Sequence, residues 1–427
     1  MSNKPRGLDP VRETLSNDVT VLVQELRTTP TVTISASINA GTLFESADTL
    51  GVAYFLTRVI DRGAARRSAD EIAEVLDLKG VSLSVNVTRN SLTLSCNVLS
   101  EDFMTVLKIL AEVIRDPTCS DNEILKRRGE VLTAIHQDED NPAVKAVERL
   151  MELLYGGAHP YGRRVKGTQE SVNRIDRKTL IDFHRQNFAP SVLSVVVVGD
   201  IDAGSAVEQV THAFGDWRAT PANRPLLAAP VSASQRRRVV VPMMNKSQAD
   251  VGYGFTTVPR TDPSYYAYWL MANILGQYGM GGRLGHSIRE QQGMAYYAFC
   301  SFEADQIAGP LVVRAGVNAT NVDRVVESID REITKISCDG VQDVELENSK
   351  RYLIGSMPRT LETNAGIAGF LQTVERFDLG LNYDQRLPDL LEGVTRDDVN
   401  AAAAHTLSPD RAAMVIAGPY AGPVSRG

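Results

Sequence analysis

The sequence predicts an α+β protein of two tandem homologous domains, each an antiparallel-rich mixed sheet packed against helices. Length is the first reason, because a chain of 427 residues is too long for one ordinary core. Composition is the second, since 43% hydrophobic and 23% charged residues are typical of a globular protein with a sizeable core. The third reason is an internal duplication, in which helix and strand patterns recur in the same order.

The clearest repeat lies toward the end of each half of the chain. One copy is IDRKTLIDFHRQNFAPSVLSVVVVGD, starting at Ile175, and the other is VTRDDVNAAAAHTLSPDRAAMVIAGP, starting at Val394. Aligned without a gap, the two copies place Gly199 against Gly418. Both predict a helix, a proline-bearing turn, an apolar strand and a glycine.

A second repeat lies earlier in each half. It pairs LKGVSLSVNVTRNSLTLSCNVLSEDFMTVLKILAEVI with QQGMAYYAFCSFEADQIAGPLVVRAGVNATNVDRVVESIDREI, and both copies predict a glycine, two alternating strands and an amphipathic helix. Between the halves, ATPANRPLLAAPVSASQ is rich in Ala, Pro and Ser and predicts a linker. We therefore expect an N-terminal domain over residues 1–218, a linker over 219–238 and a C-terminal domain over 239–427.

Charge and composition exclude several classes of protein. The net charge of -7 argues against a nucleic-acid-binding protein, which needs a basic excess to displace counterions from phosphates. No apolar run reaches the roughly 18 residues that a membrane span requires. The opening stretch, MSNKPRGLDPVRETLSNDVTVLVQE, lacks the apolar region of a signal peptide, so the sequence favours the cytoplasm, or the periplasm if an export signal has been removed. Without a C-x-x-C pair, the four cysteines are expected to be free thiols.

The stretch TLGVAYFLTRVIDRGAARRSADEI predicts an amphipathic helix followed by a basic turn. On that helix Tyr54, Thr57 and Arg58 share one face, at a spacing that suits two metal ligands and a general base. None of the three is a usual zinc ligand. The pattern therefore has the frame of a metal site without its donors.

Eight stretches spread along nearly the whole chain resemble, in order, the pitrilysin/insulinase family of inverted zincins, and most of all its mitochondrial processing peptidase type. The stretches that carry the resemblance are INAGTLFE, AYFLTR, RRSADEI, LLYGGAHPYGRRVKGT, FAPSVLSVVVVGDID, KSQADVGYG, ILGQYGMGGRLGHSIREQQGMAYYA and VTRDDVNAAAAHTL.

In active members of that family an H-x-x-E-H helix supplies two zinc ligands and the general base. The resemblance places the first histidine on Tyr54, the glutamate on Thr57 and the second histidine on Arg58, and it places a third ligand, a glutamate, on Ala134. Zinc needs three protein donors, and arginine adds a fixed positive charge instead. We therefore predict no metal and no other cofactor in this chain. The run from His136 to Asp140 is the best alternative metal candidate, but a solvated helix end explains it better.

The resemblance also implies an arginine and a tyrosine that act on the substrate, and in RLGHSIREQQGMAY these are Arg289 and Tyr296. In the family the tyrosine donates to the oxyanion and the arginine holds a substrate carbonyl. From the residues alone, Arg289 falls in the last turns of a helix and Tyr296 in the strand that follows. The alternative is that Arg289 pairs with a surface carboxylate and Tyr296 is an ordinary strand residue. Tyr297 alternates to the opposite face, which makes it the natural negative control.

The glycine-rich stretch GQYGMGG resembles the mobile loop with which the family's non-catalytic subunit receives substrate. This interpretation makes Gly279, Gly281 and Gly282 candidate substrate-binding residues. A tight turn that needs positive φ is the alternative. The stretch lacks the order and the lysine of a phosphate-binding loop.

These observations favour a zinc-free, non-catalytic subunit of a heterodimeric processing-type metallopeptidase. It would bind extended peptide and supply Arg289 and Tyr296 to an H-x-x-E-H partner, which holds the zinc. The alternative is a structural scaffold that resembles the core subunits of respiratory complexes and has no role in proteolysis. A metal-independent peptidase would need a nucleophile with a base beside it, and no G-x-S-x-G elbow occurs.

Overall fold

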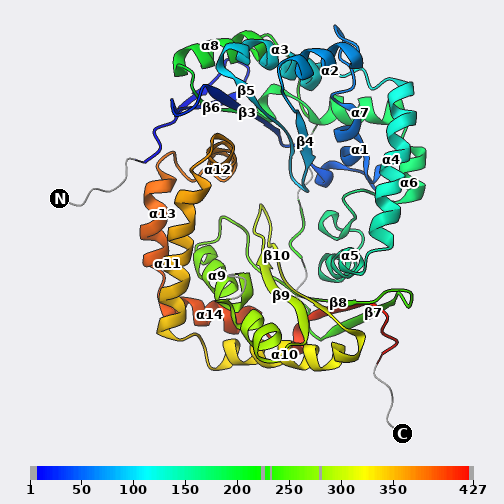
Figure 1. The fold of residues 1–427 in the computed structure, drawn as a ribbon, viewed down its shortest axis with the longest axis vertical. Coiled ribbons are helices and arrows are strands. Elements are labelled where there is room, and N and C mark those ends of the chain that lie inside the picture. The colour runs from blue at the N-terminus through cyan, green and yellow to red at the C-terminus, as the bar shows by residue number, and fades with distance from the viewer. Residues whose placement is uncertain (1–6, 223–226, 231–232, 278–280, 423–427) are drawn as a thin grey trace, which may run out of the picture. The chain divides into compact units, whose positions relative to one another are not determined.

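The computed structural model describes residues 7–222, 227–230, 233–277 and 281–422 (Figure 1). The chain forms two compact units, each assembled from three separate stretches. The described part of unit 1 lies within residues 7–135, 164–222 and 357–386, and that of unit 2 within 136–163, 227–356 and 387–422.

Unit 1 contains a six-stranded mixed sheet in the order β1-β2-β6-β3-β5-β4. Its strands are β1 (Val11–Thr14), β2 (Thr20–Glu25), β3 (Thr31–Ile38), β4 (Ser84–Val87), β5 (Leu92–Leu99) and β6 (Leu193–Gly199). Only β2 and β6 run parallel to each other, and valine-rich β6 is buried almost throughout, as a central strand covered on both faces should be. The helices within this unit are α1 (Val52–Val59), α2 (Ala69–Leu78), α3 (Phe103–Arg115), α6 (Gln169–Arg174), α7 (Arg177–Asn187), α8 (Ala203–Phe214) and α12 (Asn364–Arg376).

Unit 2 contains a five-stranded mixed sheet in the order β7-β11-β8-β10-β9. Its strands are β7 (Arg237–Pro242), β8 (Ala249–Thr256), β9 (Ala295–Phe302), β10 (Pro310–Val317) and β11 (Ala413–Gly418). The helices within it are α5 (Pro142–Tyr155), α9 (Tyr265–Ala272), α10 (Val322–Cys338) and α14 (Arg396–Thr406). Three helices span the division between the units, namely α4 (Asp121–Glu139), α11 (Asp343–Thr360) and α13 (Tyr383–Glu392).

The two sheets share one topology, which confirms the predicted fold class and the internal repeat. The order β2-β6-β3-β5-β4 in unit 1 corresponds strand by strand to β7-β11-β8-β10-β9 in unit 2, and the parallel pair occupies the same place in each. The glycines that end the repeat also match, because Gly199 has φ 143° and Gly418 has φ 136°. A side chain would be strained at such values, so both copies keep glycine.

The compact units are not simply the two sequential halves of the chain. Helix α5, from the first half, packs on β8 and β11 of unit 2, whereas α12, from the second half, packs on β6 and β3 of unit 1. Glycine in β8 permits the first contact, since a side chain at Gly254 would lie only 3.1 Å from Leu150 Cδ2. In the second, Gln372 Nε2 donates to the Ser35 carbonyl at 2.8 Å. The predicted boundaries 1–218, 219–238 and 239–427 describe the repeat along the chain and stay a prediction.

Two further expectations concern the described residues. None of the helices there is long and apolar enough to cross a membrane. The cysteines are free, as predicted, and three of them are buried. The part of residues 219–236 that the structure describes forms no helix or strand, and β7 begins at Arg237.

Candidate functional site

Helix α1 carries the predicted motif face and begins from an unusual cap. Gly51 has φ 87°, in the left-handed region, and its amide donates to Glu45 Oε2 at 3.0 Å. The Ala53 amide donates to Glu45 Oε1 at 2.9 Å. A carboxylate at a helix N-terminus satisfies otherwise unpaired amides and favours the helix dipole. Glu45 is only 5% exposed, so this buried cap fixes where α1 begins.

The side chains at the first two motif positions, Tyr54 and Thr57, either make other contacts or offer no usual zinc ligand. Thr57 is only 6% exposed, and its Oγ1 donates to the Tyr54 carbonyl at 2.7 Å. This is a bond within one helix turn that satisfies the hydroxyl locally. Tyr54 is half-buried, and Lys166 Nζ lies 5.9 Å from its ring centroid. No carboxylate stands at the position of the general base.

The second ligand position carries a cation within a charged network. Arg58 Nη2 lies 3.9 Å from Glu130 Oε2 on α4, and both side chains are largely exposed. Arg127 Nη1 pairs with Glu130 Oε1 at 2.5 Å and Arg127 Nε with Glu123 Oε2 at 3.4 Å. The Glu130 carboxylate is therefore shared between two guanidinium groups. One helix turn beyond Glu130, Ala134 contributes only a methyl group.

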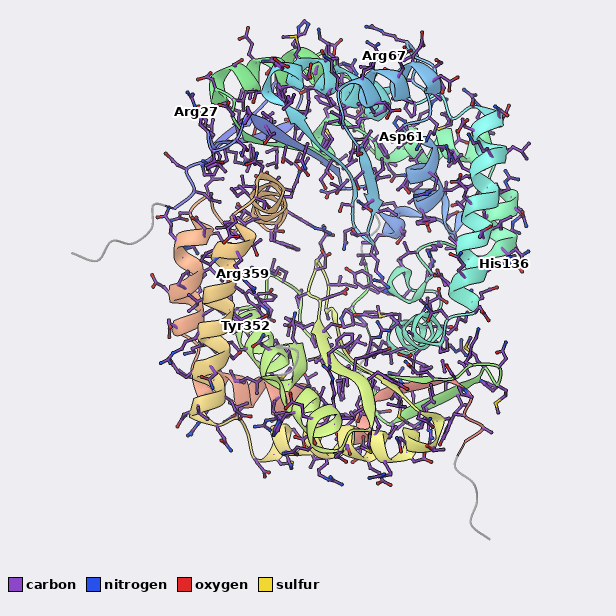
Figure 2. The ribbon with its side chains drawn as sticks, viewed as in Figure 1. Arg27, Asp61, Arg67, His136, Tyr352 and Arg359 are labelled. Atoms are coloured by element: carbon purple, nitrogen blue, oxygen red, sulfur yellow. The ribbon has the colours of Figure 1, made fainter. Side chains whose placement is uncertain are left out.

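The surroundings of these positions repel a dication. Asp61 follows α1 (Figure 2). Three arginines are near enough to this carboxyl group to influence its pKa. Burial raises the pKa of Asp61, and the positive charges of Arg62, Arg127 and Arg58 oppose that shift. A zinc ion does not fit this site, because the three zinc-ligating side chains are missing and fixed positive charges lie nearby. Within the described ranges, no cluster of three or more His, Cys, Asp or Glu side chains could hold a metal.

The alternative metal candidate at the end of α4 is a surface feature. His136 lies in the last turn of α4 (Figure 2). Asp140 pairs with Lys246 Nζ at 2.5 Å, and its side chain is 68% exposed. This agrees with the interpretation of the run as a solvated helix end.

Arg289 lies in the π-helical segment η8 (Gly285–Gln291), just before β9. It is exposed, and among the described residues no ion pair or hydrogen bond engages its guanidinium. The neighbouring Glu290 instead pairs with His286 Nδ1 at 2.9 Å. The surface ion pair that offered a structural explanation of Arg289 is therefore not formed in the described part of the chain.

Tyr296 stands at a β-bulge, which the sequence pattern did not reveal. On β10, Gly316 pairs with Tyr297 and the next residue, Val317, pairs with Ala295, so Tyr296 has no partner across the ladder. A bulge re-aims the side chain of its extra residue. The Tyr296 side chain is 70% exposed. No hydrogen bond joins it to Arg289 in the described residues.

Tyr297, the next residue, is held by a buried polar group. Its hydroxyl donates to the carboxylate of Asp250 on β8, which is only 2% exposed. Arg314 Nη2 lies 3.7 Å from the same carboxylate. A side chain at Gly316 would come within 2.5 Å of the Tyr297 ring, so the glycine makes room for it. Tyr297 anchors the end of β9 and is not a neutral control position.

The titration of this pair follows from its burial. Burial raises the pKa of Asp250, and the hydrogen bond from Tyr297 opposes that shift. Burial, followed by the hydrogen bond to Asp250, raises the pKa of Tyr297. The phenol therefore stays protonated and remains a donor to the carboxylate.

The glycine candidates have separate outcomes. Gly279 lies outside the described residues, and Gly281 is exposed. Gly282 is buried, and a side chain there would lie 2.6 Å from the Cα of Gly276. Close approach of two backbone segments explains glycine at position 282 without a ligand. A substrate-binding role for the three residues stays a prediction.

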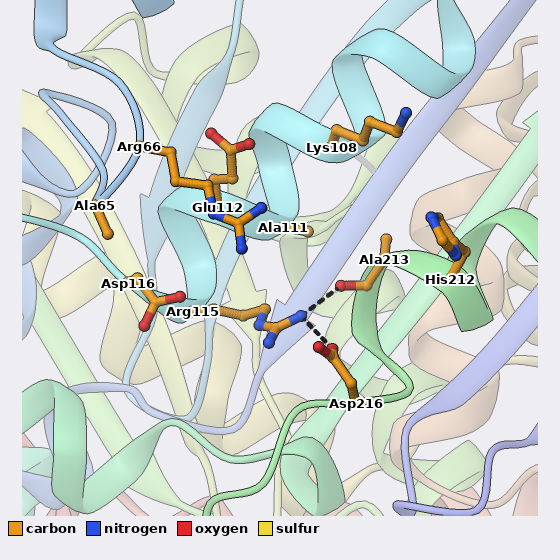
Figure 3. A pocket seen from close by; sticks show the side chains of 10 residues that line it. All are labelled: Ala65, Arg66, Lys108, Ala111, Glu112, Arg115, Asp116, His212, Ala213 and Asp216. Carbon is orange, nitrogen blue, oxygen red and sulfur yellow. Dashed lines mark hydrogen bonds and ion pairs between the residues drawn. The ribbon is translucent and has the colours of Figure 1, made fainter.

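The hollows that lie within single units include two whose linings contain no predicted site residue. The first, about 300 Å³, lies beside α3 and the end of α8, where Arg115 Nη1 donates to the Ala213 carbonyl at 2.8 Å and to Asp216 Oδ1 at 2.6 Å (Figure 3). The second, about 820 Å³, lies beside α9, α13 and α14. Cationic and anionic side chains alternate around the first hollow, so neither sign dominates it.

With this geometry in place, comparison with known families decides the assignment. Residues 20–168 match the insulinase family, peptidase family M16, and residues 174–353 match the peptidase M16 inactive domain. The chain belongs to the peptidase M16 family. The predicted pitrilysin/insulinase resemblance is thus confirmed.

Relatives of this M16 protein cover almost its whole length. An uncharacterized zinc protease of Mycobacterium bovis is 26% identical over 421 residues, which cover 97% of this chain and 94% of the relative. The non-peptidase homolog YmxG of Helicobacter pylori is 24% identical and covers 91% of this chain and 89% of its own. A crystal structure of a peptidase M16 inactive domain from Pseudomonas fluorescens has a TM-score of 0.89 at 24% identity, with 98% and 99% coverage, and supports the fold. Since its motif positions lack the zinc donors, this chain is an inactive, peptidase-like M16 member.

Proposed function

We propose that this chain is the zinc-free subunit of a heterodimeric, processing-type metallopeptidase of the inverted-zincin kind. It binds extended peptide substrate and supplies Arg289 and Tyr296 to the active site of an H-x-x-E-H homologue. The observation that carries the proposal is Tyr296, an aromatic residue lifted out of the ladder by a bulge and 70% exposed. Bulges of this kind are frequent beside active sites.

The chemistry of peptide hydrolysis gives these two side chains a role. Attack of water on the peptide carbonyl generates an oxyanion, and the partner's zinc would activate that water and polarise the carbonyl. The Tyr296 hydroxyl donates a hydrogen bond to the developing oxyanion. The Arg289 guanidinium holds a neighbouring main-chain carbonyl of the substrate. A preorganised donor of this type contributes about 3 kcal/mol to the lowering of the barrier.

A scaffold protein has less use for this arrangement. Exposing a tyrosine ring gives up the burial that would stabilise the fold, and an unpaired arginine seven residues earlier in the chain adds no ion pair. Both residues are exposed and unengaged among the described residues, which supports a role outside the chain's own folding. A cytoplasmic location belongs to the same proposal.

The test is reconstitution from purified subunits. The chain alone, its H-x-x-E-H homologue from the same genome alone, and an equimolar mixture are assayed on a quenched fluorescent peptide, with zinc measured in each. We expect no stoichiometric zinc and no hydrolysis for the chain alone, and hydrolysis by the mixture well above that of the homologue. One zinc per chain in the isolated protein, or a mixture no more active than the homologue, would overturn the proposal.

A further inference from the structure

The Tyr297 side chain crosses one whole strand of the sheet in unit 2. Gly316 of β10 pairs with Tyr297 of β9 on one side and with Asp250 of β8 on the other, so the three residues form one row. Neighbouring strands lie about 4.8 Å apart, and a phenol can span two such steps only over a small residue. Gly316 meets this condition, because a side chain there would lie 2.5 Å from Tyr297 Cε1. The Tyr297 hydroxyl therefore reaches the Asp250 carboxylate over the main chain of β10.

Further donors surround the Asp250 carboxylate, which is only 2% exposed. Gln248 Nε2 donates to Asp250 Oδ2 at 3.4 Å, and Arg314 Nη2 lies 3.7 Å from Asp250 Oδ1. The Arg314 guanidinium also lies 5.8 Å from the Tyr297 ring centroid. Burying a carboxylate costs free energy, and an apolar residue of similar size often serves stability equally well. The direction that this acceptor gives to Tyr297 therefore explains it better than a gain in stability does.

The same row borders the bulge that exposes Tyr296. The ladder changes register directly after Gly316, which leaves Tyr296 as the extra residue. A slip of one residue would turn every side chain of the strand to the other face. The direction of Tyr296 therefore depends on the position of the next residue, Tyr297, whose hydroxyl is bound to Asp250.

The other side of the bulge is tied to the segment that carries Arg289. The Met294 amide donates to the Ile288 carbonyl at 3.1 Å, and the Gly293 amide donates to the Arg289 carbonyl at 3.2 Å. Gly293 has φ 60°, in the left-handed region, which lets the chain turn from η8 into β9. Main-chain hydrogen bonds thus fix the bulge on this side, and the Tyr297 side chain fixes it on the other.

We propose that Asp250 is a positioning residue, which directs the exposed Tyr296 ring by holding the Tyr297 hydroxyl beside the bulge. Asp250 touches no substrate and acts through these two tyrosines in turn. The inference rests on the proposed function for the role of Tyr296, which is to donate to the oxyanion. The direction of the ring is a property of the chain alone, so it can be measured without catalysis.

The direct test places 3-fluorotyrosine at position 296 of the full chain and records its ¹⁹F spectrum with a soluble gadolinium chelate. We expect one resonance, strongly relaxed by the chelate, both for the otherwise unchanged chain and for Asp250→Asn, which keeps an oxygen acceptor for Tyr297. Asp250→Leu has a similar volume and no acceptor, and it should produce a second resonance that the chelate relaxes less. Tyr297→Phe, which removes only the donor, should do the same. A spectrum that neither variant alters would overturn the inference.

A second triad in unit 2 supplies a matched control. The Tyr253 hydroxyl donates to Asp330 Oδ1 at 2.9 Å, and Arg236 Nη1 donates to Asp330 Oδ2 at 2.8 Å. The Arg236 guanidinium lies 5.6 Å from the Tyr253 ring centroid, and no member of this triad belongs to β9. Asp330→Leu should therefore leave the ¹⁹F spectrum unchanged. The same second resonance in this variant would show that lost stability alone moves the ring, and would overturn the inference.

In the reconstituted mixture the inference predicts a loss of kcat. Asp250→Leu should lower kcat by about tenfold or more with KM little changed, because a misdirected donor fails in the transition state. Asp250→Asn should keep most of the rate. In a Tyr296→Phe background Asp250→Leu should lower kcat no further, since the group that it positions is gone. An equal further loss in both backgrounds would overturn the inference.

The inference and the proposed function can fail separately. If the ¹⁹F resonance responds to Asp250→Leu as expected but the unaltered mixture is inactive, the positioning by Asp250 stands and the proposed function fails. If the mixture is active and loses kcat with Tyr296→Phe, while the resonance ignores both Asp250→Leu and Tyr297→Phe, the proposed function stands and the positioning role fails.

Discussion

Thr57 Oγ1 donates a hydrogen bond to the main-chain carbonyl of Tyr54 at 2.7 Å. Thr57, which stands where the family resemblance places the general base, is therefore hydrogen-bonded to Tyr54, which stands where it places the first zinc ligand. The next residue, Arg58, places its guanidinium group 3.9 Å from the Glu130 carboxylate. The helix keeps its place because Glu45 caps it and its apolar side chains are buried.

Restoring the donors should restore metal binding. We expect the combined variant Tyr54→His, Thr57→Glu, Arg58→His and Ala134→Glu to retain close to one zinc per chain after dialysis, because it regains three ligands and loses the opposing cation. The matched control keeps Ala134, has only two histidine ligands, and should retain far less zinc. Elemental analysis by mass spectrometry measures both. No zinc in the combined variant would mean that Ala134 does not occupy the third ligand position.

Replacing Tyr297 should cost stability. Tyr297→Phe leaves the buried Asp250 without its phenol donor, and we expect unfolding free energy to fall by about 1 to 3 kcal/mol in urea titrations near neutral pH. In the folded chain the pKa of Asp250 lies above its usual 3.8. The free energy of unfolding therefore falls as pH rises from about 3.8 through the folded pKa, because the buried carboxyl group ionises. Loss of the donor makes the ionised form less favourable still. The cost should thus be larger near pH 7 than near pH 4, and an equal cost at both would contradict this explanation.

Mild acid should destabilise the protein through His184. This side chain is 6% exposed, and its Nε2 lies 2.7 Å from the Ile114 carbonyl, so Nε2 carries the proton and donates. Burial lowers the pKa of His184 below its usual 6.5, whereas the unfolded chain takes up a proton near that value. The contribution of neutral His184 to stability is therefore complete above about pH 6.5, and it is lost as the pH falls below that value. Replacement His184→Gln should flatten the dependence of the urea midpoint on pH between about 7 and 5, and an unchanged slope would contradict the assignment.

The sequence allowed the duplicated fold to be predicted because its signals are local. Glycines with positive φ, such as Gly199 and Gly418, and the period of apolar residues mark helix ends and strands without knowledge of the tertiary structure. The exchange of α5 and α12 between units could not be predicted in this way. An amphipathic pattern shows that a helix needs a partner, but which sheet has room depends on residues such as Gly254, which are distant in sequence.

The site was predictable to a similar extent. Motif spacing predicts that Tyr54, Thr57 and Arg58 share one helix, and α1 includes all three. The prediction of opposite faces for Tyr296 and Tyr297 depends on strict alternation, which the bulge at Tyr296 interrupts. The bulge was missed because an extra residue on one strand appears only when its partner strand is known. The bond from Tyr297 to Asp250 was missed for the same reason, since these residues belong to strands that are not adjacent in the sheet.

The most direct measurement of the central claim is the kcat of the reconstituted mixture with Tyr296→Phe, which removes one hydroxyl group from the exposed ring. The matched control is Tyr54→Phe, the same change at a position with no expected role in catalysis. We predict that Tyr296→Phe lowers kcat by ~100-fold or more, with subunit association and zinc content unchanged, and that Tyr54→Phe leaves kcat as it is. A mixture that keeps its full kcat with Tyr296→Phe would contradict the claim that this chain completes its partner's active site.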